Sequence, residues 1–417
     1  MEFNLFFQAM KPAIKMSVNH IAYLRNTVME YAWGSYTAIA DLMGQASPSQ
    51  QPQAELWLGA HPKAPSWVKT EGGWESLADL IQAYPAEILG EKTVDRFGAQ
   101  LPFLLKVLAA ARPLSVQAHP AQAAAQTGFD REEGLGIPLN APHRNYKDPH
   151  HKPECICALT PFWGLCGFRN RDACASLLRR LCPLSMGALL DRLQTSGRDG
   201  MAHWFQSVMN LHPEQKARIV EEAVDRAKAH RHEAPVWEWI VRLHHSYPSD
   251  IGVIFPAVLN LVCLRPGEAL YLRPGELHAY LEGLGIEIMA NSDNVLRGGL
   301  TAKHVDVPEL IRVLSFDSKT IEILTPKKHE SGEAIYATPA GAFQLAVIHL
   351  KAGEAYTARR ERSVEILLCT TGRHRVMELN GRNPLVLSKG SSLLVPAAAA
   401  GYVIEGQGVV YKAGVPL

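Results

Sequence analysis

The chain has 417 residues, and its 42 Lys and Arg nearly balance 41 Asp and Glu, so the formal net charge is +1. A charge this close to zero provides no global field that would attract nucleic acid or an anionic membrane, and we expect neither as a partner. Hydrophobic residues make up 47% of the sequence and charged residues 20%, which excludes a largely disordered chain. The length predicts two or three domains.

The sequence carries no signal for secretion or membrane insertion. Its start, MEFNLFFQAMKPAIKM, has only a short apolar patch before Lys11 and no small-residue cleavage site. No apolar run approaches the roughly 18 residues that span a bilayer. The seven cysteines are an odd number in a chain too large to need disulfide staples. We therefore expect a cytoplasmic protein.

The texture of the sequence changes along the chain. Residues up to about 170 contain short β-like runs such as AELWLGAHP and LPFLLKVL. From 171 to about 250, apolar residues recur at helical spacing, and His212-Pro213-Glu214 is typical of a helix start. A β texture returns over 251–329 and continues from 330 to 417 in short strands separated by Gly and Pro. This last segment predicts an antiparallel sandwich or jelly roll.

Two stretches share one order of elements. LRPGEALYLRPGELHAY and LSKGSSLLVPAAAAGYVI both predict strand, Gly turn, strand, Pro turn and strand. The similarity indicates two copies of one small β-barrel unit. Only the first copy has a histidine, His278, after its Pro turn, whereas Pro396 in the second is followed by AAAAG. We expect the second barrel to hold no metal.

Polar side chains interrupt the β-prone stretch PLSVQAHP, residues 113–120. Gln117 and His119 are two positions apart, so on a strand both would point to the same face. Glu154, which opens the run ECICAL, and His278 complete a set of two imidazoles, a carboxylate and an amide. Such a set suits a divalent transition metal, most simply Zn²⁺ with one position open to substrate.

Each of these residues also has a simpler interpretation. His119 could be an ordinary core or surface histidine. Glu154 could lie in water at the mouth of its strand, paired with Lys152. Cys155 and Cys157 form a C-x-C pattern that could bind metal, but no second Cys pair lies at zinc spacing. Packing on the outward face of the strand is the expected role of these two thiols.

Five motifs identify a resemblance to a known family. They are YAWGS (31–35), AELWLGAHP (54–62), PLSVQAHP (113–120), NYKDPHHKPE (145–154) and ANSDNVLRGGLTAKHVDVPEL (290–310). Together they closely resemble type I mannose-6-phosphate isomerase, from about Val18 to the C-terminus. Several long motifs in the right order make this resemblance specific. Residues 1–16 have no counterpart and are expected to be an N-terminal extension, so Met1, Met10 or Met16 could be the start.

The resemblance implies a mainly β zinc enzyme of the cupin superfamily, with two cupin-type jelly-roll barrels and an α-helical domain. It implies a discontinuous catalytic cupin domain over 17–170 and 251–329, a helical domain over 171–250 and a metal-free cupin-like domain over 330–417. One Zn²⁺ per chain would be held in the Q-x-H, K-P-E and H-A-Y motifs, at Gln117, His119, Glu154 and His278.

The motif NSDNVLRGGLTAKH supplies charge. Arg297 matches the family's catalytic arginine, Lys303 resembles its companion at the substrate phosphate, and Asp293 lies in the same motif. A guanidinium suits phosphate because its donors are planar and paired. From the residues alone, both cations could equally be solvated loop charges.

A general base is also needed, because an aldose and its ketose differ by one proton moved between C2 and C1. Lys152 and His151, next to Glu154, are candidates, and so are Tyr280 and Glu287, which follow His278. The sequence does not choose among them.

The function implied by the resemblance is reversible interconversion of mannose 6-phosphate and fructose 6-phosphate through an enediol-type intermediate, a reaction of carbohydrate metabolism linked to GDP-mannose biosynthesis. Two alternatives stay open. One is a cupin dioxygenase or decarboxylase that uses iron or manganese through two histidines and a carboxylate. The other is a non-catalytic cupin that binds a sugar phosphate. The small-molecule sugar phosphate is the expected partner of a monomer or weak dimer.

Overall fold

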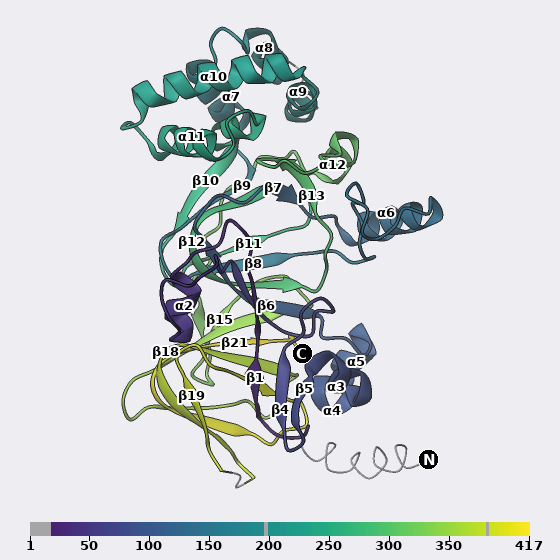
Figure 1. Cartoon of the computed structure of the whole chain (residues 1–417), viewed down its shortest axis with the longest axis vertical. Helices are drawn as coiled ribbons and strands as arrows, with labels where there is room; N and C mark the ends of the chain where they lie inside the picture. The colour runs from purple at the N-terminus through teal and green to yellow at the C-terminus, as the bar shows by residue number, and fades with distance from the viewer. Residues whose placement is uncertain (1–17, 196–198, 381–382) are drawn as a thin grey trace.

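The computed structural model describes residues 18–195, 199–380 and 383–417. Figure 1 shows an elongated molecule with a block of helices at one end, a β-sheet next to it and a second sheet at the other end. The expected N-terminal extension, residues 1–16, lies outside the described residues. Within them, no helix is both long enough and apolar enough to cross a membrane.

The sheet in the middle of the molecule carries the predicted site residues. Among the described residues it has ten strands, and β12 is its hub because it pairs antiparallel with β6, β7, β8 and β9. The strands are β2 (Thr27–Met29), β3 (Glu55–Leu58), β6 (Phe103–Ala110), β7 (Val116–Ala118), β8 (Glu154–Ala158), β9 (Phe162–Phe168), β10 (Leu259–Leu264), β11 (Ala269–Leu272), β12 (His278–Ala290) and β13 (Leu296–Gly299).

The second sheet has eleven strands among the described residues, and their pairings are antiparallel. Most come from residue 327 onward: β14 (Lys327–Lys328), β15 (Ala334–Tyr336), β16 (Gln344–Leu350), β17 (Ala355–Thr357), β18 (Glu365–Glu378), β19 (Leu385–Ser388), β20 (Ser392–Val395) and β21 (Tyr402–Gly414). The other three are β1 (Ala22–Arg25), β4 (Trp67–Thr70) and β5 (Gly73–Ser76). The protein is therefore rich in antiparallel sheet, as expected.

The three N-terminal strands of this second sheet do not follow the division of the chain into domains that the sequence predicts. β1 pairs with β20, with Tyr23 opposite Leu393, and β4 continues the sheet beyond β1. These strands come from the segment that the sequence assigns to the catalytic barrel, so strand pairing crosses the boundary expected at residue 330. The physical reason is that an unpaired β20 would leave a sheet edge with unsatisfied backbone groups.

The helices gather mainly in the segment where the sequence predicts them. That segment holds α7 (Arg171–Leu181), α8 (Gly187–Thr195), α9 (Gly200–Met209), α10 (Pro213–His230) and α11 (Pro235–Ser246), followed by the 3₁₀ helix η2 (Ile251–Ala257). The predicted helix start is confirmed, because Pro213 opens α10 and the His212 backbone N–H donates to Gln215 Oε1 at 3.1 Å. Trp239 of α11 packs this block against the ten-stranded sheet, because its ring lies 5.8 Å from that of Trp163 in β9.

Other helices lie outside that block: α2 (Ala38–Met43), α3 (Leu77–Ala83), α4 (Pro85–Leu89), α5 (Glu91–Phe97), α6 (Gln122–Gly134) and α12 (Val307–Val313). Figure 1 shows α6 projecting from the side of the middle sheet. The strand echo predicted from the sequence is also present. β10, β11 and β12 repeat the order of β19, β20 and β21, with the turns where Gly and Pro predict them.

The two cysteines of the C-x-C pattern serve packing. Cys155 and Cys157 are fully buried in the apolar layer that both sheets share, on the opposite face of β8 from Glu154. The Cys157 thiol lies 3.1 Å from the Tyr336 hydroxyl, across the two sheets. All seven cysteines are free, and burial raises the pKa of the Cys155 thiol. The packing interpretation of these two residues is confirmed.

Helix α6 packs closely against the segment before the K-P-E motif, at Gly128 and Tyr146. A Cβ on Gly128 would lie 2.3 Å from the ring of fully buried Tyr146, whose hydroxyl donates to Glu309 at 2.6 Å. Replacing a helical glycine by alanine usually stabilises by about 1 kcal/mol. Here we expect Gly128→Ala to destabilise the protein by about 1 to 3 kcal/mol instead, because the ring has to move. Chemical denaturation of the full chain measures the change.

Gly134→Ala is the matched control, since it lies in the same helix and its added Cβ meets nothing within 4 Å. It should leave the free energy of unfolding unchanged or raise it. Equal destabilisation by both variants would contradict the packing argument.

Candidate functional site

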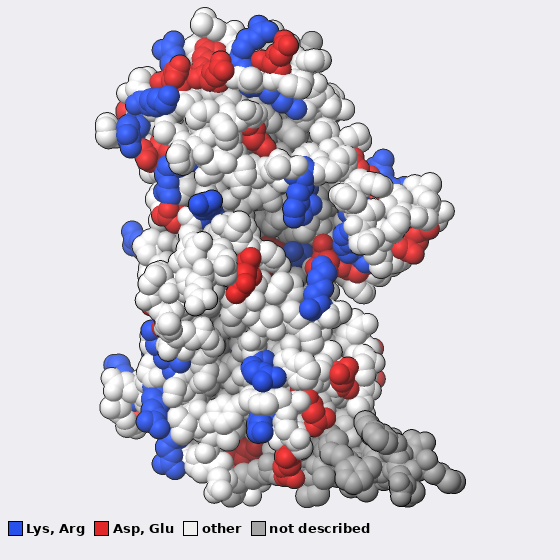
Figure 2. Space-filling view, viewed as in Figure 1, with Lys and Arg blue, Asp and Glu red and all other residues white. Residues whose placement is uncertain are grey.

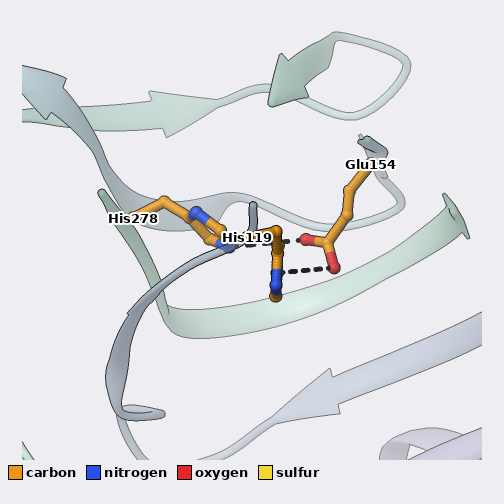
Figure 3. A group of neighbouring side chains, drawn as sticks. All are labelled: His119, Glu154 and His278. Atoms are coloured by element: carbon orange, nitrogen blue, oxygen red, sulfur yellow. Dashed lines mark ion pairs between the residues drawn. The ribbon is translucent and has the colours of Figure 1, made fainter. Parts of the chain in front are cut away.

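Three side chains converge inside the middle sheet. His119, Glu154 and His278 each offer a ligand atom, and these atoms all lie within 4.8 Å of one another. Each residue is at most 2% exposed. Glu154 Oε1 lies 3.1 Å from His119 Nε2, and Glu154 Oε2 lies 3.4 Å from His278 Nε2. Figure 3 shows the two imidazoles facing the two oxygens of the carboxylate.

Strand ends position these three side chains. Glu154 is the first residue of β8 and His278 the first residue of β12, and these strands pair antiparallel in one sheet. His119 comes directly after β7, whose Gln117 lies opposite His278. Residues that begin or follow strands combine a rigid scaffold with access from outside, which is why sites often lie there.

Both imidazoles are held in the same tautomer by the backbone. His119 Nδ1 donates to the Asn294 carbonyl at 2.6 Å, and His278 Nδ1 donates to the Glu276 carbonyl at 2.9 Å. Their Nε2 atoms therefore carry the lone pairs, and among the described residues neither Nε2 has a hydrogen-bond partner. Burial lowers the pKa of His119 to about 4, which keeps this ring neutral at pH 7.

A bound cation would balance the charge of the Glu154 carboxylate and accept the lone pairs of the two imidazoles. Burial by itself would raise the pKa of Glu154, but the Lys152 ammonium holds that pKa well below its usual range, so the carboxyl is anionic. The Nε2 atoms of two imidazoles thus face one buried carboxylate. Histidines fixed through Nδ1 by backbone carbonyls are the usual arrangement behind a metal. The residues present fit a divalent cation such as Zn²⁺.

Gln117 lies in line with this group. In the ladder of β12, β7 and β13 it is opposite His278 on one side and Arg297 on the other. Directly opposed residues of antiparallel strands share a face of the sheet. The amide is therefore on the same face as the His278 imidazole. Ligation by Gln117 stays a prediction.

Two of the candidate bases touch the group directly. Lys152 Nζ lies 3.1 Å from Glu154 Oε1, and Lys152 is only 7% exposed. The Tyr280 hydroxyl donates to Glu154 Oε2 at 3.3 Å, and burial raises the pKa of this tyrosine well above its ordinary value. The ion pair of Lys152 with Glu154 was an alternative to metal binding. The structure places it deep in the sheet and not in water at the strand mouth.

Glu287 pairs with Lys106, a buried residue that the sequence analysis did not single out. Its carboxylate lies 3.0 Å from Lys106 Nζ, which also lies 3.4 Å from Glu55. Lys106 is 6% exposed, and although burial would lower its pKa, Glu287 and Glu55 together raise it. A lone lysine in the apolar run LPFLLKVL was the available signal, since a buried ammonium requires anionic partners.

His151, the fourth candidate base, and Asp293 of the charged motif lie toward the outside of the group. The His151 backbone N–H donates to Gln122 at 3.1 Å, and its half-buried side chain lines a cavity of about 270 Å³. Asp293 pairs with Lys63 at 2.7 Å and with His61 at 3.4 Å. Burial would raise the pKa of Asp293, but these two partners hold it low. No contact brings either residue to the three ligand atoms among the described interactions.

The two cations expected at a phosphate lie near each other. The proximity of Arg297 is the main cause that lowers the pKa of Lys303, followed by partial burial. Burial lowers the pKa of Arg297, and no ion pair to it occurs among the described residues. Figure 2 shows the surface hollowed between the helical block and α6, with charged side chains around the hollow. Like charges held together without an acid are typical of an anion site.

Asn294 connects the parts of this site. Its backbone carbonyl holds His119, and its fully buried side chain donates to the carbonyls of Asp148 and His150 at 2.7 and 2.9 Å. Its Oδ1 accepts from the Lys147 N–H at 2.6 Å. One residue thus ties a metal-facing imidazole, the loop before Lys152 and the segment before Arg297 together.

Known proteins resemble this chain over most of its length. A family model described as the catalytic domain of type I phosphomannose isomerase matches residues 21–171. The mannose-6-phosphate isomerase of Salmonella typhimurium is 41% identical over 376 residues, which cover 90% of this chain and 94% of the relative. The Homo sapiens enzyme is 32% identical over 411 residues, covering 92% and 95%. The chain belongs to the mannose-6-phosphate isomerase family.

Solved structures of mannose-6-phosphate isomerases share the fold. A zinc-bound crystal structure is 38% identical and aligns with a TM-score of 0.86 over 95% of this chain and all of that one. A phosphomannose isomerase variant from Salmonella typhimurium is 37% identical, with a TM-score of 0.88 and the same coverage. Family membership confirms the expected resemblance and makes the chain an isomerase.

The metal group yields a direct test. We expect His278→Ala to lose bound zinc and isomerase activity together, because removing one imidazole leaves an incomplete ligand set that binds zinc more weakly. Elemental analysis of the purified protein measures the zinc per chain. The fold should persist. Circular dichroism checks this and should show an unchanged β-sheet content.

The control is His374→Ala, which removes another histidine of 1% exposure from β18, far from the group in the chain. It should retain zinc and activity. Full zinc content in His278→Ala would show that this imidazole is not a ligand.

Proposed function

We propose that the chain interconverts mannose 6-phosphate and fructose 6-phosphate with one bound Zn²⁺. The observation that carries the proposal is the buried group of His119, Glu154 and His278, with two unpartnered Nε2 atoms facing one carboxylate. Family relatives with the name mannose-6-phosphate isomerase support the substrate, and a zinc-bound solved relative supports the ion. Gln117 is the fourth proposed ligand, supported by its position opposite His278.

The zinc, when bound, would supply Lewis-acid stabilisation for negative charge that develops on the sugar oxygens. The chain's own residues would handle the proton that moves between C2 and C1. Of the four candidates, Lys152 is supported best, because its Nζ is buried and lies against Glu154. Tyr280 would orient the same carboxylate through its hydroxyl. We propose an enediol-type intermediate, since abstraction beside a carbonyl leads to it.

Glu287 and His151, the remaining candidate bases, have positioning roles in this proposal, and so has Asp293. Glu287 is engaged with Lys106, so it would fix that ammonium at the inner wall of the sheet. Asp293 would orient Lys63 at the rim, and His151 would shape the loop that leads to Lys152. Arg297 and Lys303 would hold the phosphate. The pairing of β12 with β7 and of β7 with β13 would set the distance between Arg297 and the three metal-facing residues.

We also propose the domain organisation that the resemblance implies. The catalytic cupin barrel would comprise 17–170 and 251–329, the helical domain 171–250 and a metal-free cupin-like barrel 330–417, with β1, β4 and β5 of the first segment extending the sheet of the second barrel. The order of strands shared by β10–β12 and β19–β21 supports two related barrels. Seven free cysteines support a cytoplasmic location. A monomer or weak dimer stays a prediction.

Family membership disfavours both alternatives. An oxidative cupin with iron or manganese would not need paired cations near a substrate phosphate. A non-catalytic sugar-phosphate-binding cupin would not need a complete set of metal-facing residues.

The proposed activity is tested with zinc-replete protein and mannose 6-phosphate, with fructose 6-phosphate measured as product. Removal of zinc by a chelator should abolish turnover, and zinc alone should restore it. Product formation with iron or manganese but not with zinc, or oxygen consumption during turnover, would favour the oxidative alternative. Binding of mannose 6-phosphate by zinc-replete protein without any product would favour the non-catalytic one.

Arg297 provides a test of the phosphate role. Truncating one partner of a desolvated ion pair costs about 2 to 5 kcal/mol, so Arg297→Ala should lower kcat/KM for mannose 6-phosphate by at least ~30-fold. Zinc content and thermal stability should barely change. Removing the phosphate from the substrate should then harm the variant far less than the wild type.

Arg265→Ala, at an exposed turn, removes the same charge elsewhere and should keep wild-type kinetics. If Arg297→Ala still discriminates mannose 6-phosphate from mannose as well as the wild type does, Arg297 does not bind the phosphate.

A further inference from the structure

The C-terminal sheet contains a positional counterpart of the catalytic group. β12 and β21 are both 13 residues long, and β21 begins with Tyr402 where β12 begins with His278. Each long strand pairs near its far end with the first residue of a neighbour, and that residue is a buried glutamate: Glu154 in β8 and Glu365 in β18. The Tyr402 hydroxyl donates to Glu365 Oε2 at 2.8 Å. The two sheets therefore place polar side chains at similar positions, with a register that differs by one residue.

An ammonium group lies within this second set of residues. Lys412 Nζ is 3.0 Å from Glu365 Oε1 and 3.1 Å from the Tyr356 hydroxyl, and it also pairs with Glu333. Lys412 is 7% exposed and Glu333 is fully buried. The positive charge that a metal would supply in the catalytic group is here part of the chain. These carboxylates therefore need no metal ion.

A cavity of about 420 Å³ opens beside this ammonium, at the ends of β16, β18 and β21. Its charged lining comprises four basic and two acidic side chains: Lys92, Arg359, Arg362, Lys412, Glu361 and Glu365. Concave sites of a few hundred Å³ with a few convergent polar groups are the usual form of small-molecule sites. The cavity thus has the size and polarity for a small charged molecule.

Two guanidinium groups in this lining have hydrogen-bonding capacity left over. The Nε atoms of Arg359 and Arg362 are buried and lack a hydrogen-bond partner among the described residues. Arg362 donates to the carbonyls of Pro396 and Ala400 at 2.8 and 3.1 Å, and none of the described ion pairs involves it. A buried donor without a partner is costly, so a ligand that drew these guanidinium groups toward the cavity and accepted from them would be favoured.

Charge balance indicates the sign of that ligand. Arg359 pairs with Glu333 at 2.7 Å, and Lys412 is shared between Glu333 and Glu365. At the mouth, Lys92 pairs with Glu361, and both side chains are exposed. Arg362 is then the cation in this lining that has no carboxylate partner among the described ion pairs, so its guanidinium charge is left unpaired. An anion would compensate it.

We propose that this cavity is a second ligand site, which binds the phosphate group of a small metabolite. Guanidinium donors match phosphate oxygens, and the buried ammonium of Lys412 strengthens the attraction in a low dielectric. The ligand is either free phosphate or a sugar phosphate that is not turned over. The inference does not depend on the reaction at His119, Glu154 and His278.

Calorimetry on the zinc-loaded full chain tests the proposal, with inorganic phosphate and glucose 6-phosphate as probes. We expect two classes of binding site in the wild type. Arg359→Gln should weaken one class at least tenfold while the inhibition constant of phosphate against mannose 6-phosphate turnover stays within twofold. Arg360→Gln, an exposed neighbour outside the cavity lining, is the matched control and should change neither class.

Because Arg359 pairs with buried Glu333, its variant could be impaired in folding. Lys92→Glu reverses an exposed charge at the mouth of the cavity without that risk, and it should weaken the same class at least threefold.

A single class in the wild type whose dissociation constant equals the inhibition constant would overturn the proposal. Equal weakening by Arg360→Gln would also overturn it, as would unchanged binding in folded Arg359→Gln or in Lys92→Glu. Tighter binding of glucose 6-phosphate than of phosphate would identify a sugar phosphate as the ligand, and the reverse order free phosphate.

Discussion

The buried carboxylate of Glu154 is the constraint on which the site depends. It is 1% exposed, and an uncompensated charge at that depth would cost several kcal/mol. Everything around it supplies compensation: the Lys152 ammonium, the Tyr280 hydroxyl and two imidazoles that present lone pairs for a cation. The backbone carbonyls that hold the imidazoles sit in turns whose side chains are themselves fixed, as Glu276 is by Lys319 at 2.6 Å. A charge placed in one strand thus dictates residues in several others.

The same problem has a different solution in the C-terminal sheet. There, Glu333 and Glu365 are also buried, but Lys412 and Arg359 pair with them and no imidazole faces them among the described contacts. Unlike a metal ion, a lysine of the chain does not have to be bound from solution and offers no open coordination position. It can therefore stabilise the fold or contribute to binding, but it cannot act as a Lewis acid. Comparing the two sheets shows how one strand arrangement can carry either reactive or fixed positive charge.

Sequence reasoning predicted those parts of the structure that depend on local pattern. Gly and Pro turns located β10, β11 and β12, and the 3.6-residue period located the helices between 171 and 246. His119, Glu154 and His278 were grouped by their types and by family resemblance, and the structure brings them together. What the sequence could not give depends on register between distant strands. Lys106 meets Glu287 only because β6 and β12 pair with these two residues opposite each other. The roles of Asn294 and Glu276 were also invisible, since each holds a histidine through its backbone carbonyl, which every residue type possesses.

The strand β1 has a consequence for how the protein is made. It closes the C-terminal sheet against β20, and the Tyr23 hydroxyl bonds to the carbonyl of Val386, 363 positions further along the chain. A ribosome releases β1 long before β20 exists, so this edge of the sheet has no native partner for most of synthesis. Contacts this distant in sequence close slowly and leave strand edges open to other chains in the meantime. The middle sheet, whose β12 partners all precede residue 290, can be complete before that final pairing. The catalytic half of the molecule is therefore assembled early, while the chain's first strand is among the last to find its place.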